Sequence, residues 1–250
     1  MNNMNENFDA FDDYAMKYDF EEEAIRRKYE HSYRVMRESD AIVYSLNLEE
    51  DDSYLACLIG LLHDVGRFPQ WQEYKSFNDS KSINHALLGA KMLFDEGLIN
   101  KFKLDESDYD LVRTAIENHN VLELNENKLK DKVLLHSKII RDADKIDILY
   151  EISTPRIMGL ENDDSKINNE VKTSFYKHEP IDRKNIKTVN DRVVMKLALV
   201  YGLYFDYSRK TVLERKYLDR LYESLKNKEI FRPYYEEVKK YLEGCVKDVR

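Results

Sequence analysis

The chain has 250 residues, enough to bury a large hydrophobic core without a disulfide or a structural metal. It contains only 7 glycines and 4 prolines in 250 residues. Glycine and proline together make up about 12% of an average chain. This scarcity of turn formers disfavours sandwiches and barrels with many tight hairpins, and it favours long helices. The net charge of −8 argues against nucleic-acid binding through a global basic surface.

The sequence shows no targeting or membrane signal. Its first 14 residues are acidic and polar, without the basic and apolar regions of a secretory signal, and no apolar run approaches 18 residues. Cys57 and Cys245 are too few for a disulfide framework or a cysteine-based metal site. We therefore expect a cytoplasmic protein without a membrane partner.

Helical patterns follow an N-terminal arm that is expected to be irregular over residues 1–17. Periodic apolar residues predict five helices in the next part of the chain, over 18–46, 54–63, 83–96, 105–118 and 133–152. The segment 67–82 is expected to form a loop or short helical turns, and the polar segment 156–187 a loop or lid. Three further helices are predicted over 189–207, 212–225 and 234–246.

The dipeptide His63-Asp64 ends the apolar segment 55–62. Such a segment is expected to be buried, and two unpaired polar groups at its end would be costly. A metal ion would satisfy both groups, whereas the alternative is a solvated pair at a helix end. The dipeptide alone does not decide between them.

Other histidines and a carboxylate occupy similar positions on other predicted helices. His31 lies on the apolar side of the first helix, His85 is in the first turn of a helix, and His119 ends an apolar helix as His63 does. Asp144 lies beside the apolar positions of a long helix, where a carboxylate needs a partner. Imidazole with carboxylate suits iron, manganese, nickel, cobalt or zinc and disfavours a pure magnesium site.

The order of these residues resembles the HD-domain superfamily of metal-dependent phosphohydrolases. Three segments are similar to its successive motifs: His31-Ser-Tyr-Arg-Val, Leu-Leu-His63-Asp64-Val-Gly-Arg and Asp142-Ala-Asp144-Lys-Ile-Asp147. The stretch from Phe77 to His85 resembles a bacterial subgroup of uncharacterised HD proteins, and that similarity extends over nearly the whole chain. The match is specific for the superfamily and not for a substrate.

The resemblance implies an all-α fold, an HD-domain helical bundle with additional C-terminal helices. It implies one HD-type domain over 1–250, which divides into four parts: the arm at 1–17, a metal-binding helical core at 18–155, the polar loop or lid at 156–187 and C-terminal helices at 188–250.

The resemblance also implies a metal site that holds one or two divalent ions of iron, manganese, nickel, cobalt or zinc. Its implied ligands for one ion are His31, His63, Asp64 and Asp144, with Asp142 as the alternative to Asp144. In addition, His85 and His119 match the extra histidines of dinuclear members such as the HD-GYP phosphodiesterases, in which the aspartate of the His-Asp pair bridges two metals. The Gly-Tyr-Pro signature is absent, so the cyclic-dinucleotide assignment does not transfer.

The activity implied by the resemblance is hydrolysis of a small phosphomonoester or phosphodiester, with a nucleotide-like substrate. A metal-bound hydroxide would attack phosphorus, with Asp64 and His63 as the catalytic pair. We expect Arg34, Arg67 and Lys145 to contact the phosphate, and a surface salt bridge is the alternative for each. We also expect the chain to form a homodimer.

Two other functions remain open at this stage, a mixed-valent di-iron oxygenase and a non-catalytic, metal-stabilised ligand-binding protein. Asp79 and Ser82 are expected to orient His85 through hydrogen bonds, with helix capping as the alternative for Ser82. His136 is 80° away from Asp144 around its helix and is expected to be structural. His178, in a polar stretch, is expected to have no direct role.

Overall fold

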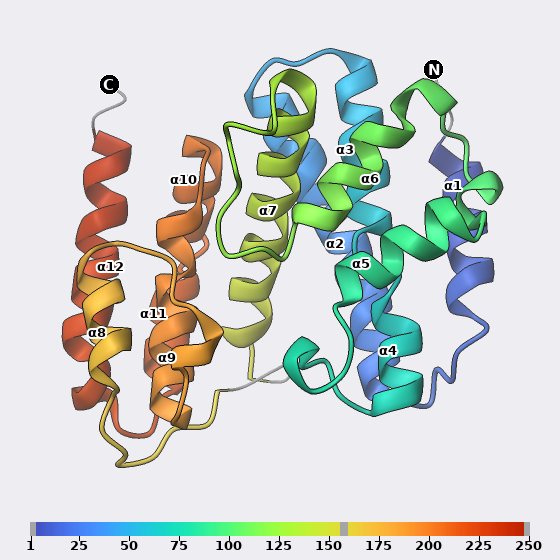
Figure 1. Cartoon of the computed structure of the whole chain (residues 1–250). Coiled ribbons are helices and arrows are strands. Elements are labelled where there is room, and N and C mark those ends of the chain that lie inside the picture. The colour runs from blue at the N-terminus through green and yellow to red at the C-terminus, as the bar shows by residue number, and fades with distance from the viewer. Residues whose placement is uncertain (1–3, 156–159, 248–250) are drawn as a thin grey trace. The chain divides into compact units, whose positions relative to one another are not determined.

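The computed structural model describes residues 4–155 and 160–247 (Figure 1). The remaining positions belong to the predicted arm, the predicted lid and the end of the C-terminal helices, and these parts of the predictions lie outside the described residues. The described residues form helices and no strand, so the all-α prediction is confirmed. None of the described helices is both long and apolar enough to cross a membrane.

The chain divides into two compact units, residues 1–144 and 145–250. The first unit contains α1 (Met4–Ala15), α2 (Glu23–Ser45), α3 (Glu50–Leu62), α4 (Arg67–Tyr74), α5 (His85–Ala90), α6 (Tyr109–Asn118) and the first part of α7 (Asp131–Ile152). The second unit contains the last part of α7 and then α8 (Asn169–Tyr176), α9 (Val189–Leu197), α10 (Asp206–Glu214), α11 (Tyr217–Ser224) and α12 (Lys228–Lys247). The prediction that both units form one domain stays a prediction.

Helix α3 forms the centre of the first unit. Its buried residues, among them Leu55, Ala56, Leu58, Gly60 and Leu61, lie on all sides of the helix instead of forming one stripe. A helix that is apolar on all sides must be covered on all sides, and α3 packs against α1, α2 and α6. The ends of α3 and of its neighbours therefore lie in an apolar environment.

Two glycines allow the turn after α3 to approach α5. A Cβ atom on Gly66 would lie 2.2 Å from the carbonyl oxygen of His85 and 2.7 Å from the backbone nitrogen of Gly89. Both distances are shorter than any real Cβ contact, so no other residue fits at position 66 without a backbone shift. Gly89 lies opposite, where a Cβ atom would be 3.2 Å from the backbone nitrogen of Gly66, and this close contact holds the His63-Asp64 turn against the start of α5.

Several segments differ from the prediction, among them the helices predicted over 189–207 and 212–225, since α10 spans the predicted break between them. Residues 4–15, expected to be irregular, form α1, because Asn7, Phe11, Tyr14 and Ala15 recur on one buried face despite the acidic composition. The segment 67–82, expected to form a loop or short helical turns, begins with the short helix α4, where Pro69 is tolerated because it lies in the first helical turn.

In the predicted lid, Val171 and Phe175 lie one turn apart and are buried on α8. Buried side chains of the later helices, among them Leu197, Val212, Leu221 and Phe231, form the apolar interior of the second unit. The second unit therefore has its own core, and part of the predicted lid belongs to it.

We predict that Gly66→Ala destabilises the first unit by about 2 kcal/mol or more, because its methyl group collides with the backbone of α5. Urea unfolding followed by fluorescence of Trp71, the single tryptophan, measures the effect. Gly244→Ala is the control, since a Cβ there meets nothing within 4 Å and alanine favours a helix. An unchanged Gly66→Ala midpoint would contradict the proposed close contact.

Candidate metal centre

Two histidines of the first unit occupy equivalent positions at the ends of helices. His63 directly follows α3, and its Nδ1 atom lies 2.8 Å from the carbonyl oxygen of Gly60. His119 directly follows α6, and its Nδ1 atom lies 2.7 Å from the carbonyl oxygen of Ile116. The last carbonyls of a helix lack partners within the helix, so each imidazole satisfies one of them. The same contact fixes the orientation of each ring.

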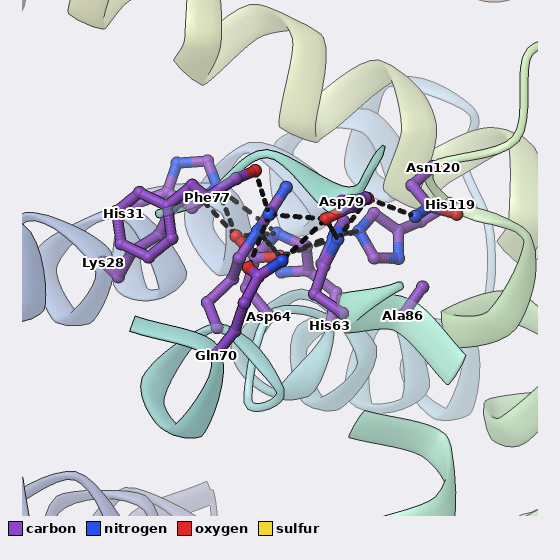
Figure 2. Close-up of polar contacts among 12 residues, drawn as sticks. Lys28, His31, His63, Asp64, Gln70, Phe77, Asp79, Ala86, His119 and Asn120 are labelled. Carbon is purple, nitrogen blue, oxygen red and sulfur yellow. Dashed lines mark hydrogen bonds and ion pairs between the residues drawn. The ribbon is translucent and has the colours of Figure 1, made fainter. Parts of the chain in front are cut away.

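The carboxylate of Asp64 lies at the centre of the site and is buried (Figure 2). Its Oδ2 atom lies 3.5 Å from the Nε2 atoms of both His31 and His63. Its Oδ1 atom lies 3.2 Å from Nε2 of His85 and 3.7 Å from Nε2 of His119. Each oxygen therefore faces its own pair of imidazoles, which is the arrangement of a carboxylate that bridges two cation sites.

Asp144 adds a second carboxylate to the first pair of histidines. Its Oδ1 atom is 3.2 Å from Nε2 of His31 and 3.8 Å from Nε2 of His63. Asp142, the alternative ligand, is 200° away around the same helix and is completely buried. The measured contacts to the histidines therefore favour Asp144. All six predicted metal ligands lie together in the first unit.

The hydrogen bonds of the histidines determine which ring nitrogens are free. A carbonyl oxygen only accepts, so Nδ1 of His63 and of His119 must carry the proton, and in a neutral ring Nε2 is then an acceptor. Nδ1 of His85 likewise donates to the carboxylate of Asp79 at 2.8 Å. The Nε2 atoms of His85 and His119 nevertheless face each other at 2.9 Å. Two lone pairs at this separation repel each other unless a cation lies beside them.

Burial and charge act in opposite directions at this site. Burial lowers the pKa of His63 to about 3 and also lowers the pKa of His85, so both rings are neutral at neutral pH. Burial opposes ionisation of Asp64, yet the ammonium of Lys28 holds the pKa of this carboxyl well below its usual value. Neutral imidazoles beside an ionised carboxylate are the protonation states that divalent transition metals require.

Asp79 orients His85, as the sequence predicts, and it is itself held by several donors. Its Oδ1 atom accepts hydrogen bonds from Arg67 and Gln70, each at 2.9 Å, and its Oδ2 atom accepts one from Asn120 at 3.2 Å (Figure 2). Burial opposes ionisation of Asp79, but its bonds to His85 and the other donors lower its pKa strongly. A charged carboxylate behind a ligand histidine fixes the tautomer and raises the basicity of the ring.

Ser82 has a different role from either one expected for it. Asn84 caps α5 by accepting from the backbone nitrogens of Ala86 and Leu87. The Ser82 hydroxyl instead accepts a hydrogen bond from Gln70 at 2.9 Å. It therefore supports the Asp79 network through Gln70.

Arg141 holds the segment that follows α6, and sequence reasoning missed it. Its guanidinium donates to the carbonyl oxygens of Asn118, His119, Val121 and Leu122 at 2.6–3.2 Å. A cation is favoured at the carboxyl end of a helix, where the carbonyl groups carry partial negative charge. No local sequence pattern reveals this role, because the four carbonyls lie about 20 residues away along the chain.

Lys28 is the second residue that sequence reasoning missed. It lies on α2 three positions before His31, and its Nζ atom is 2.8 Å from Oδ2 of Asp64. Residues three apart on a helix share a face, so the spacing to His31 is the signal that could have found it. Its side chain is only 12% exposed, which places a largely buried positive charge directly on the Asp64 carboxylate.

The three expected phosphate contacts have different surroundings. Arg34 lies on α2 one turn after His31, with NH1 3.6 Å from a carboxylate oxygen of Glu30. Arg67 lies in the Asp79 network, and its Nε atom is 3.5 Å from Oδ1 of Asp64. Lys145 belongs to the second unit, where its ammonium lies 5.8 Å from the ring centre of Tyr204. Contact of these residues with a substrate stays a prediction.

The two remaining histidines have partners of their own. His136 is buried, with Nε2 3.1 Å from Oδ1 of Asp52. His178 lies in the second unit, with Nε2 2.8 Å from a carboxylate oxygen of Glu237. Both contacts agree with the expectation that neither histidine is a ligand.

Comparison with protein families agrees with the geometry. Residues 29–149 match the family described as HD domain, and this segment contains all six candidate ligands. No curated protein and no solved structure matches the chain. This part of the chain is therefore an HD domain, a helical domain with clustered histidines and aspartates that could hold a metal.

We predict that Asp79→Asn weakens metal binding by about 10- to 100-fold, because the amide no longer places a negative charge behind His85. Titration of the metal-free protein in competition with a chelator measures the affinity. Asp95→Asn, which changes an exposed carboxylate paired with Arg113, is the control and retains wild-type affinity. Equal affinities of wild type and Asp79→Asn would show that Asp79 does not support the site.

The buried pair of His136 and Asp52 predicts a pH-dependent stability. Burial lowers the pKa of His136, so the ring is neutral in the folded metal-free protein while the unfolded chain takes up a proton below about pH 6.5. The unfolded state then binds more protons, so stability falls as the pH falls. Lys132, 3.0 Å from the same Asp52 oxygen, and Asp108 are the other charged groups that act on this pair.

We therefore expect His136→Gln to reduce the slope of unfolding free energy against pH, by up to about 1.4 kcal/mol per pH unit below pH 6.5. Urea unfolding followed by Trp71 fluorescence at several pH values measures the slope. His178→Gln, in the second unit, leaves it unchanged. An identical slope for His136→Gln and wild type would contradict the proposed origin.

Proposed function

We propose that this HD-domain protein is a metal-dependent phosphohydrolase that cleaves a small phosphomonoester or phosphodiester, with a nucleotide-like molecule as the expected substrate class. One observation carries the proposal. Two pairs of histidines point their Nε2 atoms at the two oxygens of one buried carboxylate, Asp64. The HD domain belongs to a superfamily that consists mostly of metal-dependent phosphohydrolases, which supports the same conclusion.

The residues fit two divalent transition-metal ions. His31, His63 and Asp144 would hold one ion, His85 and His119 the other, and Asp64 would contact both. The nitrogen-rich donor set favours iron, manganese, nickel, cobalt or zinc. Bound divalent ions supply an activated water and a positive charge that polarises a phosphoryl oxygen.

The protein side chains fix the geometry for this reaction. The single carboxylate of Asp64 contacts both pairs of histidines. The backbone carbonyl oxygens of Gly60 and Ile116 accept hydrogen bonds from His63 and His119 and so fix the orientation of these two rings. The side chains of the four histidines are at most 2% exposed, so bulk water is excluded from most of the centre. The side chain of Asp144 is 18% exposed, which makes it the most accessible ligand.

The other sequence expectations remain part of this proposal. They include a cytoplasmic location, a small phosphorylated molecule as partner, and a second copy of the chain as a further partner. The same donors would also suit the two irons of an oxygenase, so the activity assay must separate the two reactions.

We predict that the purified protein, stripped of metal and reloaded with manganese, cobalt or nickel, releases phosphate from esters in a screen that includes nucleotides. The double substitution His63→Ala with Asp64→Ala abolishes this activity and the bound metal while the helical circular dichroism is largely retained. Both groups would contribute directly to the centre, so their loss leaves no complete site. Metal analysis and phosphate release are the two measurements.

His178→Ala is the matched control, since this histidine belongs to the second unit, and it retains metal and activity. Metal that persists in the double variant would show that the site is wrong. Absence of phosphate release with every metal, together with an iron spectrum that responds to oxygen, would replace hydrolysis with oxygenase chemistry.

A further inference from the structure

We infer that Lys28 and Arg27, neighbours on α2, form an anion-binding site beside the metal centre and receive phosphate oxygens of the substrate. The inference rests on the proposed function and assigns a substrate-binding role to two residues that lie outside the expected set of Arg34, Arg67 and Lys145. Three observations support it: the position of the Lys28 ammonium, the lack of a counter-charge on Arg27, and the engagement of Arg67 elsewhere.

Lys28 and the first pair of histidines share one carboxylate oxygen. The ammonium lies 2.8 Å from Oδ2 of Asp64, and the same oxygen lies 3.5 Å from Nε2 of His31 and of His63. A divalent ion held by these histidines would also bind this oxygen. Two positive charges on one oxygen repel each other strongly where little water screens them, so metal binding would drive the ammonium away from Asp64. An anion beside the metal offsets this repulsion.

Arg27 has an uncompensated positive charge. Its side chain is half-buried, and its Nε atom is buried without a hydrogen-bond partner. Among the described residues, no carboxylate oxygen lies within ion-pair distance of its guanidinium; its one recorded contact is with the ring of Phe77, whose centre is 5.8 Å from Cζ. A buried donor without a partner is rare and costs free energy. An anion would supply the missing acceptor.

Both cations approach the ring of Phe77. Nζ of Lys28 lies 5.7 Å from the centre of this ring (Figure 2), close to the 5.8 Å that separates Cζ of Arg27 from the same centre. The guanidinium of Arg67 also approaches this ring, at 5.6 Å. Three cations around one aromatic ring repel one another, so a bound anion is favoured there.

Arg67 is less available for a substrate than these two residues. Its NH1 atom already donates to the side chains of Gln70 and Asp79 and to the carbonyl oxygen of Phe77, at 2.7–2.9 Å. Moving it toward a ligand would break the network that orients His85. Lys28 would instead exchange one anionic partner for another, and Arg27 would gain one.

A calorimetric titration of the manganese-loaded protein with inorganic phosphate measures the phosphate affinity and tests the inference without relying on turnover. We expect Lys28→Met to weaken phosphate binding by about 10- to 100-fold and Arg27→Gln by about tenfold, because each loses a charged hydrogen bond. Lys28→Arg retains a cation and most of the affinity. Two control variants should retain wild-type affinity: Arg26→Gln, which changes the exposed residue before Arg27, and Lys91→Met, which removes an exposed lysine elsewhere on the surface.

A metal titration separates substrate binding from a purely structural role. Removal of a cation that competes for Asp64 should leave the manganese affinity of Lys28→Met unchanged or raise it. If Lys28 only held Asp64 in place, this variant would bind manganese more weakly, and its loaded form would bind phosphate as wild type does. Where Lys28→Met does not fold, as judged by circular dichroism, Arg27→Gln and Lys28→Arg still decide the question.

The outcomes distinguish this inference from the proposed function. Equal phosphate affinity in wild type, Lys28→Met and Arg27→Gln overturns the anion site, even if the protein hydrolyses esters. Absence of phosphate binding by the loaded wild type overturns it as well. Phosphate binding that depends on both residues supports it, and if no ester is then cleaved, only the hydrolase proposal fails.

Discussion

Burial of one ionised carboxylate, that of Asp64, is the constraint on which the candidate centre depends. Taking a carboxylate out of water costs several kcal/mol unless positive or hydrogen-donating groups surround it. Here the partners are an ammonium on one oxygen and two pairs of imidazoles divided between the two oxygens. Neutral imidazoles compensate a negative charge poorly when their lone pairs face it. The arrangement is therefore better suited to bound cations than to the protein alone.

The backbone determines where these partners can lie. The contact of Gly66 with the first turn of α5 places His85 opposite Asp64, although the two residues are about 20 positions apart. His63 and His119 are held by the carbonyls of the helices that they end. His31 and Asp144, by contrast, project from the middle of long helices. Ligands from helix ends and helix faces thus meet because the apolar part of α3, residues 55–62, requires neighbours on every side.

These physical reasons also explain what the sequence could predict. A polar group at the end of an apolar segment is visible along the chain, and this pattern points to His63, Asp64 and His119. The full set of six ligands came from the resemblance to HD-domain motifs, and the scarcity of glycine and proline favoured helices. Helix α1 was missed because four inward residues are hidden among many acids. The roles of Arg141 and Gln70 depend on carbonyls and side chains brought together by folding, and no local pattern encodes them. The role of Lys28 is an intermediate case. Its spacing to His31 is visible in the local sequence, but its contact with Asp64 arises only on folding.

An acidic protein can be compatible with a phosphorylated substrate, because the net charge and the local charges of the centre act over different distances. A net charge of −8 repels a long polyanion, but salt screens exposed charges beyond about 10 Å. A small anion that enters the centre would respond mainly to the nearest buried charges. Those include Lys28, whose nearest carboxylate, Asp64, also faces two pairs of histidines, and, in the inferred anion site, Arg27. Each bound metal ion would add two positive charges at Asp64. A net charge that disfavours nucleic-acid surfaces is therefore compatible with the proposed binding of a single phosphate group at the centre.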